Sequence, residues 1–156
     1  MYRLELLVSD AAKALYAPIA TEDRSNDNAG VDLFVAVEPE LLTGVLGVVL
    51  VKLGVKARMV RLSDGEEVHY WLAPRSSIFK NNLYIANSMG VIDRSYRGML
   101  MAAVGIINTL EDTKLPVGTR IVQILAPDMG HIKEVRLVDS LPETSRGSGG
   151  FGSTGS

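Results

Sequence analysis

The sequence contains no cysteine. This excludes a disulfide scaffold, a catalytic thiol and a thiolate metal site, and it fits a reducing intracellular compartment. Clustered positive charge is missing as well, because 16 Lys and Arg are outweighed by 18 Asp and Glu, for a net charge of −2. Gripping a nucleic-acid backbone requires uncompensated basic side chains, so we expect no nucleic-acid partner.

Long hydrophobic runs are also lacking. The longest, residues 41–51, is interrupted by Thr43, Gly44 and Gly47 and falls short of the roughly 20 residues that cross a bilayer. The amino-terminal sequence MYRLELLVSD has acidic residues within its apolar part and does not resemble a secretory signal. We therefore expect no membrane partner and a cytoplasmic protein, or one of the nucleus or a host cell if its source is eukaryotic or viral.

Helical periodicity is scarce, whereas short β-branched runs separated by Gly, Pro, Asn and Asp recur. In one domain of 156 residues this pattern predicts an all-β sandwich or jelly roll. A tight hairpin is expected at Asp64-Gly65, a dipeptide that tolerates positive φ, and one helix is expected over 76–81 with its serines as caps. The predicted strands are 30–37, 58–62, 68–72, 83–86, 100–107, 121–125 and 131–138.

Arg75, Ser76 and Ser77 would bring a guanidinium, two hydroxyls and the N–H groups of a short helix to one point. Such a point binds anions, because a helix N-terminus presents free N–H donors and arginine adds a bidentate fork. Taken alone, the pentapeptide 73–77 is more simply an ordinary helix cap beside a surface arginine. Both interpretations stay open on the residues alone.

Residues 90–98, GVIDRSYRG, form a glycine-bounded segment between two predicted strands. The glycines permit close approach of the backbone to a flat base. The Asp93 carboxylate can accept a proton from water, and the Tyr96 ring can pack against a sugar. The alternative is a β-turn with a solvated aspartate and a half-buried tyrosine.

Two further segments carry polar groups in unusual settings. Arg120 and Gln123 lie on a strand that is otherwise apolar; we expect an internal ion pair for Arg120, and Gln123 could donate to a phosphate. The last residues, RGSGGFGSTGS from Arg146, cannot build a core and are either a linker or a phosphate-binding lid with one stacking ring. We therefore divide the chain into a jelly-roll domain, 1–140, and a flexible arm, 141–156.

Read in order, the segments 29–33, 74–77, 90–98, 118–123 and 146–155 resemble the five motifs of the trimeric dUTPase family. One such motif is a weak signal, whereas five in the right order form a strong one. The resemblance implies a distorted jelly roll of the β-clip type, a homotrimer, and Mg²⁺-assisted hydrolysis of dUTP to dUMP and pyrophosphate. That reaction limits uracil in DNA and supplies dUMP for dTMP synthesis.

The resemblance also implies roles for individual residues. Asp93 would activate the attacking water and bond the sugar 3′-hydroxyl, while Tyr96 would exclude ribose. The uracil would be bound by Asn87 with Gly90, Val91 and Ile92, the phosphates by Arg75, Ser76, Ser77 and Gln123, and the arm would add Arg146, Phe151, Gly152, Ser153 and Thr154. Asp32 would lie near the metal's water network, and Mg²⁺ would be held mainly by phosphate oxygens and water.

The active sites are expected to be shared between subunits. A disordered arm is not expected to reverse easily onto the segment 90–98 of its own chain, which we expect to form a hairpin. Ser77, Ser95, Met99 and the segment Lys52-Leu53 depart from the family pattern. Three alternatives remain: a dCTP deaminase-like enzyme of the same superfamily, a non-catalytic dUTPase-like regulatory binding protein, and a capsid-type jelly roll.

Overall fold

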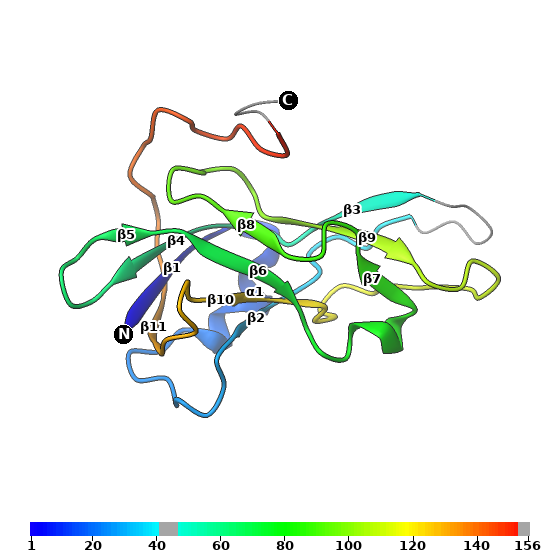
Figure 1. Cartoon of the computed structure of the whole chain (residues 1–156), viewed down its shortest axis with the longest axis horizontal. Coiled ribbons are helices and arrows are strands. Elements are labelled where there is room, and N and C mark those ends of the chain that lie inside the picture. The colour runs from blue at the N-terminus through cyan, green and yellow to red at the C-terminus, as the bar shows by residue number, and fades with distance from the viewer. Residues whose placement is uncertain (41–46, 153–156) are drawn as a thin grey trace.

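The computed structural model describes residues 1–40 and 47–152, and its chain is built almost entirely from strands (Figure 1). The helical elements are short and lie mainly near the amino terminus. In chain order the elements are β1 (Tyr2–Val8), η1 (Asp10–Ala12), α1 (Lys13–Tyr16), η2 (Ala17–Ile19), β2 (Val31–Leu33), β3 (Val48–Lys52), β4 (Val55–Arg61), β5 (Glu67–Val68), β6 (Tyr70–Pro74), η3 (Ile78–Asn81), β7 (Leu83–Ile85), β8 (Gly90–Ile92), β9 (Met101–Ile106), β10 (Val122–Leu125) and β11 (Ile132–Leu137).

The strands form three sheets within the described residues, with the orders β11-β1-β4-β5, β2-β10-β6-β8 and β3-β9-β7. Most neighbours are antiparallel, but β1 and β11 pair in parallel, with Tyr2 opposite Ile132. Inward-facing side chains from all three sheets pack into one core, including Leu4, Leu33 and Val104, all fully buried. The expected all-β jelly-roll architecture is therefore present.

The hairpin predicted at Asp64-Gly65 is confirmed. Gly65 has φ +73 and donates its N–H to the Arg61 carbonyl at 2.8 Å, so β4 turns back into β5. The single strand predicted over 68–72 is wrong, because the chain changes sheets at His69. Residues before His69 pair with β4, whereas β6 pairs with β8 and β10 of the second sheet.

The helix predicted over 76–81 is reduced to the 3₁₀ turn η3, which begins at Ile78. Neither serine caps it: Ser77 is the N-cap residue and makes no side-chain cap hydrogen bond. The helical segment from η1 to η2, in contrast, was not predicted. The segment is apolar along most of its length and too short to show a helical periodicity, and it is fixed by tertiary packing of Ala12 and Tyr16.

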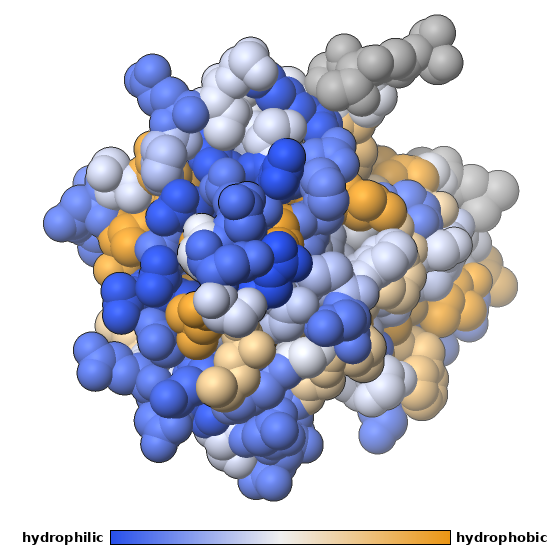
Figure 2. Space-filling view, turned by 60° about the vertical axis from the view of Figure 1, so that its left-hand side comes forward, coloured by the Kyte–Doolittle hydropathy of each residue, from blue (hydrophilic) through white to orange (hydrophobic). Residues whose placement is uncertain are grey.

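Within the described residues no helix is long and apolar enough to cross a membrane. Figure 2 shows a mostly hydrophilic face on which apolar side chains form separate patches, most extensively towards the right-hand margin. Large apolar side chains are exposed along the sheet β3-β9-β7, where Val48 and Tyr84 lie opposite Gly105 and are 57% and 49% exposed. This sheet therefore presents an apolar surface of the kind that a partner chain covers.

We predict that Tyr16→Phe destabilises the fold. The Tyr16 hydroxyl is completely buried, donates to the Leu53 carbonyl at 2.6 Å and accepts the Phe34 N–H at 3.0 Å. Its loss leaves two buried backbone groups without a partner, so the free energy of unfolding should fall by about 1–3 kcal/mol. Urea titration measures this; Tyr84→Phe, at a half-exposed ring, is the control and should change it little.

Candidate functional site

A pocket of about 280 Å³ opens between the turn that leads from β8 to β9 and the carboxy-terminal arm. Because β8 and β9 lie in different sheets, this turn does not close a hairpin. Figure 1 shows the arm passing over the end of the molecule that carries this turn. The floor of the pocket is apolar and includes Leu72, Leu100 and Val122. Nine residues predicted from the sequence line it: Asn87, Gly90, Val91, Ile92, Asp93, Tyr96, Arg146, Phe151 and Gly152.

Strand β8 forms one wall of the pocket because Gly90 allows it to lie close to β6. Gly90 pairs with Leu72, and a Cβ added at Gly90 would be 3.3 Å from the Leu72 Cβ. Val91, in contrast, is 63% exposed. A backbone edge beside an apolar floor suits a flat heterocycle that is recognised by its polar rim.

Asp93 follows β8 in the turn that leads to β9, where its carbonyl accepts the Tyr96 N–H at 3.0 Å. Its carboxylate side chain is 46% exposed and lies between the Arg146 guanidinium and the His69 imidazole. Oδ2 lies 2.5 Å from Nη1 of Arg146, and Oδ1 lies 3.7 Å from Nδ1 of His69. The pocket therefore contains a carboxylate that solvent can reach and that is paired with Arg146.

The Tyr96 ring lies flat on Gly98, where an added Cβ would meet the phenol oxygen at 2.3 Å. The hydroxyl donates to the Met99 carbonyl at 2.9 Å, which fixes the ring. Burial raises the pKa of the Tyr96 phenol, and the nearby Arg146 charge opposes this only partly. The phenol is thus a neutral, rigid wall, and the Arg146 guanidinium lies 5.4 Å from the ring centroid.

The arm lies on the turn that follows β8 of its own chain. The expectation that it does not easily reverse onto this segment is therefore wrong. The Arg97 N–H donates to the Gly147 carbonyl at 2.7 Å, and Tyr96 and Gly147 form a parallel bridge. Thr144 donates its hydroxyl to the Ser95 carbonyl and accepts the Gly147 N–H. These polar contacts orient the described arm where composition alone indicated disorder.

A second group of predicted residues surrounds Asp32 on β2. Its carboxylate pairs with Nε of Arg75 at 2.9 Å and with Nη1 of Arg120 at 3.3 Å. The ion pair expected for Arg120 is therefore present, but the Arg120 side chain is 51% exposed, so the pair is not internal. Gln123 is opposite Asp32 across β2 and β10 and donates to the Pro74 carbonyl at 3.2 Å. We call Asp32, Arg75, Arg120 and Gln123 the arginine cluster.

The arginine cluster and the pocket do not coincide in one chain. Within 1–40 and 47–152, the residues that line the pocket include neither the arginine cluster nor Ser76 and Ser77. Ser76 is exposed beside Arg75, at the start of the segment leading to η3. Ser153 and Thr154 lie outside the described residues. The predicted ligands therefore fall into two groups, one in the pocket and one around Asp32.

Sequence reasoning missed two residues that shape the pocket, His69 and Arg97. Arg97 is buried and donates to the carbonyls of Arg94, Tyr96 and Pro142. His69 accepts the Arg94 N–H. The position of Arg97 beside Gly98, in a segment already singled out, was the sequence signal that could have indicated its role. For His69 the sequence offers no such signal, because its position depends on the change of sheet.

The fold and the pocket together define a β-clip jelly roll with a candidate nucleotide site. A family model described as dUTPase matches residues 16–155, so the chain belongs to the dUTPase family. Two similar proteins are both named deoxyuridine 5′-triphosphate nucleotidohydrolase. That of Anaplasma marginale is 35% identical over 129 residues, 82% of this chain and 83% of the relative, and that of Rickettsia rickettsii is 36% identical over 136 residues, 86% of each.

Solved structures give the same result. A dUTPase from Streptococcus mutans is 32% identical and superposes with a TM-score of 0.53, covering 65% of this chain and 79% of that chain. A dUTPase of Staphylococcus bacteriophage 80alpha, solved with dUpNHpp, superposes with a TM-score of 0.53 over 80% of this chain and 88% of that chain. At 16% identity, the phage protein shows the shared fold alone.

We predict that Arg146→Ala loosens the arm in the ligand-free chain. The change removes the ion pair with Asp93 and the contact with Tyr96, while leaving the backbone bond from the Arg97 N–H to Gly147. A partly exposed pair contributes up to about 1 kcal/mol, so the Arg97 amide proton should exchange roughly three- to fivefold faster. Arg136→Ala, which removes a cation paired with Glu134 on β11, is the control. Equal exchange in both variants would contradict the assignment.

Proposed function

We propose that this chain hydrolyses dUTP to dUMP and pyrophosphate. The observation that carries the proposal is the solvent-accessible Asp93 carboxylate beside the Tyr96 ring, in a pocket floored by apolar side chains and walled by the backbone of β8. The membership of the dUTPase family and the names of the similar proteins support the same activity. They do not favour a deaminase or a non-catalytic regulatory protein.

In the proposed reaction, Asp93 accepts a proton from water as the water oxygen attacks the α-phosphorus. The bond between the α-phosphorus and its bridging oxygen breaks, and pyrophosphate leaves with the bonding electrons. The Asp93 carboxylate also accepts a hydrogen bond from the sugar 3′-hydroxyl. Arg146 must leave Asp93 before turnover, because a paired guanidinium favours the anionic carboxylate and lowers its tendency to accept a proton.

Different parts of the pocket would bind the base and the sugar of the substrate. The uracil would be held by the Asn87 side chain and the backbone of Gly90, Val91 and Ile92, all of which line the pocket. The fixed Tyr96 ring would occupy the space that a 2′-hydroxyl needs, which selects deoxyribose. An apolar floor with a few directed polar groups is the usual form of such a site.

Phosphate binding is assigned to residues of the arginine cluster and the following turn, Arg75, Ser76, Ser77 and Gln123. Because they lie apart from the pocket of their own chain, we propose that a neighbouring subunit supplies them and that the protein is a homotrimer. A cyclic trimer generates three identical composite sites by heterologous contacts. The exposed apolar surface of sheet β3-β9-β7 supports assembly.

The arm completes the proposed site. The last sheet-like bond before it runs from the Val138 N–H to the Leu6 carbonyl at 2.9 Å, so we propose a body of residues 1–140 and an arm of 141–156. In the trimer the arm would cross to a neighbouring subunit, with Arg146 on the terminal phosphate and Phe151 on the uracil. Gly152, Ser153 and Thr154 would add backbone and hydroxyl donors. For the arm to cross, its contacts with the turn that follows β8 of its own chain must break.

Members of this family generally depend on a divalent metal, and we propose Mg²⁺ for this chain. Within the described residues no group of three or more His, Cys, Asp or Glu side chains is gathered to hold an ion. A hard cation that keeps most of its water and binds with the triphosphate needs no such group. Asp32, which pairs with Arg75 and Arg120, would lie beside that water network. When bound, the ion would neutralise charge on the phosphate chain.

Asp93→Asn should retain nucleotide binding and lose most turnover. The amide has nearly the shape of the carboxylate but cannot take the proton from water, and general-base assistance contributes about 10²–10⁴-fold. Pyrophosphate release from dUTP with Mg²⁺ measures kcat, and calorimetry with a non-hydrolysable analogue measures affinity. Asp128→Asn is the matched control, because that carboxylate lies in an exposed turn before β11. Turnover by Asp93→Asn at the wild-type rate would refute the assignment.

A mixing experiment tests whether arms cross between subunits. Chains with Asp93→Asn are mixed with chains truncated before Arg146, and their subunits are allowed to exchange. Crossing arms place an intact arm over an intact base in about a quarter of the sites for random exchange of equal amounts, so activity should return to about that level.

Arms that close only their own chain would restore nothing, since every intact base would then lack an arm. Verified exchange without activity therefore contradicts crossing. The control mixture combines Asp93→Asn chains with chains that carry both changes, and it contains no intact base.

A further inference from the structure

His69 lies at the corner where the chain leaves the first sheet, after β5, and enters the second sheet at β6. This corner lies against the turn that carries Asp93. Nδ1 of His69 accepts the N–H of Arg94 at 3.0 Å and lies 3.7 Å from Oδ1 of Asp93. One imidazole nitrogen therefore contacts the backbone next to Asp93 and faces its carboxylate.

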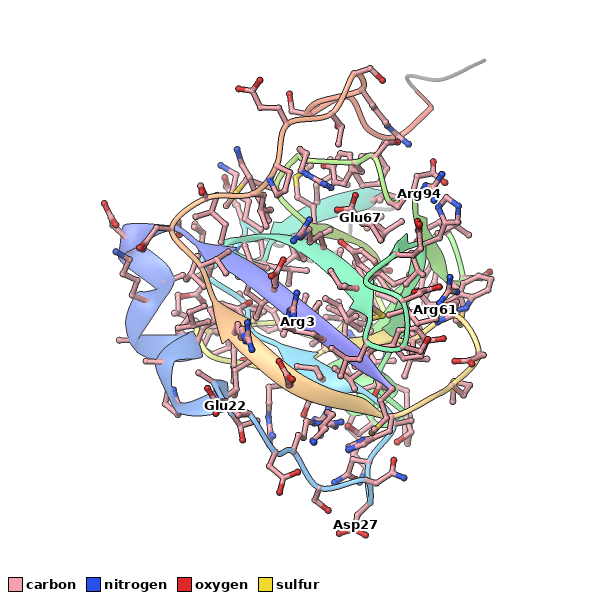
Figure 3. All side chains as sticks on the ribbon, turned by 90° about the vertical axis from the view of Figure 1, so that its left-hand side faces the viewer. Arg3, Glu22, Asp27, Arg61, Glu67 and Arg94 are labelled. Carbon is pink, nitrogen blue, oxygen red and sulfur yellow. The ribbon has the colours of Figure 1, made fainter. Side chains whose placement is uncertain are left out.

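The hydrogen bond defines the protonation of the ring. Because Nδ1 accepts a hydrogen bond from the Arg94 amide, Nδ1 carries no proton and the neutral ring has its proton on Nε2. The Arg94 side chain adds a second link, with Nη1 3.5 Å from the Glu67 carbonyl. Figure 3 shows Glu67 and Arg94 at the same end of the molecule. The turn after Asp93 is thus attached to the corner through both backbone and side chain.

The two oxygens of the Asp93 carboxylate have different surroundings. Oδ2 is paired with Arg146 of the arm, a contact that has to break for turnover, whereas Oδ1 faces His69 of the rigid body. The bond from the Arg94 N–H to His69 involves no residue of the arm, so the departure of Arg146 does not by itself break it. His69 therefore holds the turn in place in the state in which Asp93 is free to act.

We propose that His69 is a positioning residue for Asp93 that works only while its Nδ1 is unprotonated. The proposal rests on the proposed dUTP hydrolysis. A proton on Nδ1 turns the acceptor into a donor, so the Arg94 N–H loses its partner and the imidazolium pairs with Asp93 Oδ1. Pairing with a cation makes the carboxylate a weaker base, and activity falls on the acid side.

The charged groups around His69 are consistent with this behaviour. Asp93 and Arg94 face it from the turn that follows β8. Arg146 of the arm pairs with Asp93, which lies between Arg146 and His69. The Glu67 carboxylate, on the adjoining strand β5, is engaged with Arg97 and lies 3.8 Å from Arg58. Among these described groups, Asp93 is the carboxylate to which a protonated His69 can turn.

Two substitutions separate the role of His69 from its titration. His69→Asn keeps an acceptor near the position of Nδ1 but does not titrate, and His69→Ala removes the acceptor. The control is His131→Asn, at the other histidine of the chain, which precedes β11. All variants are assayed as full chains with dUTP and Mg²⁺ between about pH 5.5 and pH 8, the range over which imidazole titrates.

His69→Ala should lower kcat about tenfold near pH 8, with KM changed less than about twofold, because a displaced base costs up to about a hundredfold in rate. His69→Asn should retain kcat near pH 8. The ratio of wild-type kcat to His69→Asn kcat should fall as the pH is lowered, by at most the roughly tenfold expected for His69→Ala, because an Nδ1 that carries a proton cannot accept the Arg94 N–H. His131→Asn should follow the wild type throughout.

A wild-type kcat in His69→Ala overturns the positioning role, and a constant ratio of wild type to His69→Asn overturns the effect of protonation. A readout that needs no substrate separates these failures from failure of the proposed function. Solvent exchange of the Arg94 amide proton, followed by NMR, should be faster in His69→Ala and unchanged in His69→Asn. An Arg94 amide unaffected by His69→Ala overturns the contact itself, whereas a wild-type chain inactive on dUTP contradicts the proposed hydrolysis and, with it, the role in positioning Asp93.

Discussion

A buried guanidinium joins the segments from which the candidate site is assembled. Arg97 donates to two carbonyls of its own turn and to the Pro142 carbonyl where the arm begins, and it pairs with Glu67 of β5. The planar fork of arginine can serve all these acceptors at once, which an ammonium cannot do. The directions of the Asp93 carboxylate and of the arm therefore depend on one buried charge and its partner.

That charge is balanced by a network that extends across the first sheet. Glu67 lies between Arg97 and Arg58, and Glu5 on β1 lies between Arg58 and Arg3. Burial by itself would raise the pKa of Glu5, but the hydrogen bond and charge of Arg58 and the charge of Arg3 outweigh it, so the pKa is lowered. Figure 3 shows Arg3 on the face of this sheet. A turn of the site is thereby tied electrostatically to strands that contribute no residue to the pocket.

The parts of the fold that could be predicted are those set by local chemistry. The Asp64-Gly65 turn and the strands β7, β9, β10 and β11 follow from backbone preference and alternation, and the jelly roll follows from their number. The change of sheet at His69 could not be predicted, because 68–72 reads as one apolar strand whichever sheet it joins. The same limit explains η3, where serines that suit a helix cap make no cap hydrogen bond. That Asp93, Tyr96 and Arg146 belong to one site was inferred from the order of the motifs. That the arm lies on the turn after β8 of its own chain depends on contacts of Arg97 and Thr144, which no sequence pattern reveals.

The parallel pairing of β1 with β11 determines when the molecule can be completed. Tyr2 is synthesised well before its partner Ile132, because almost all of the other strands lie between them in the sequence. Until Ile132 is available, one edge of β1 exposes unpaired backbone groups, which are a template for pairing with other chains. Contacts between such distant parts of a chain also close slowly. The first sheet is therefore finished only after the residues between β1 and β11 have been translated, and the arm that covers the pocket follows β11 and emerges later still.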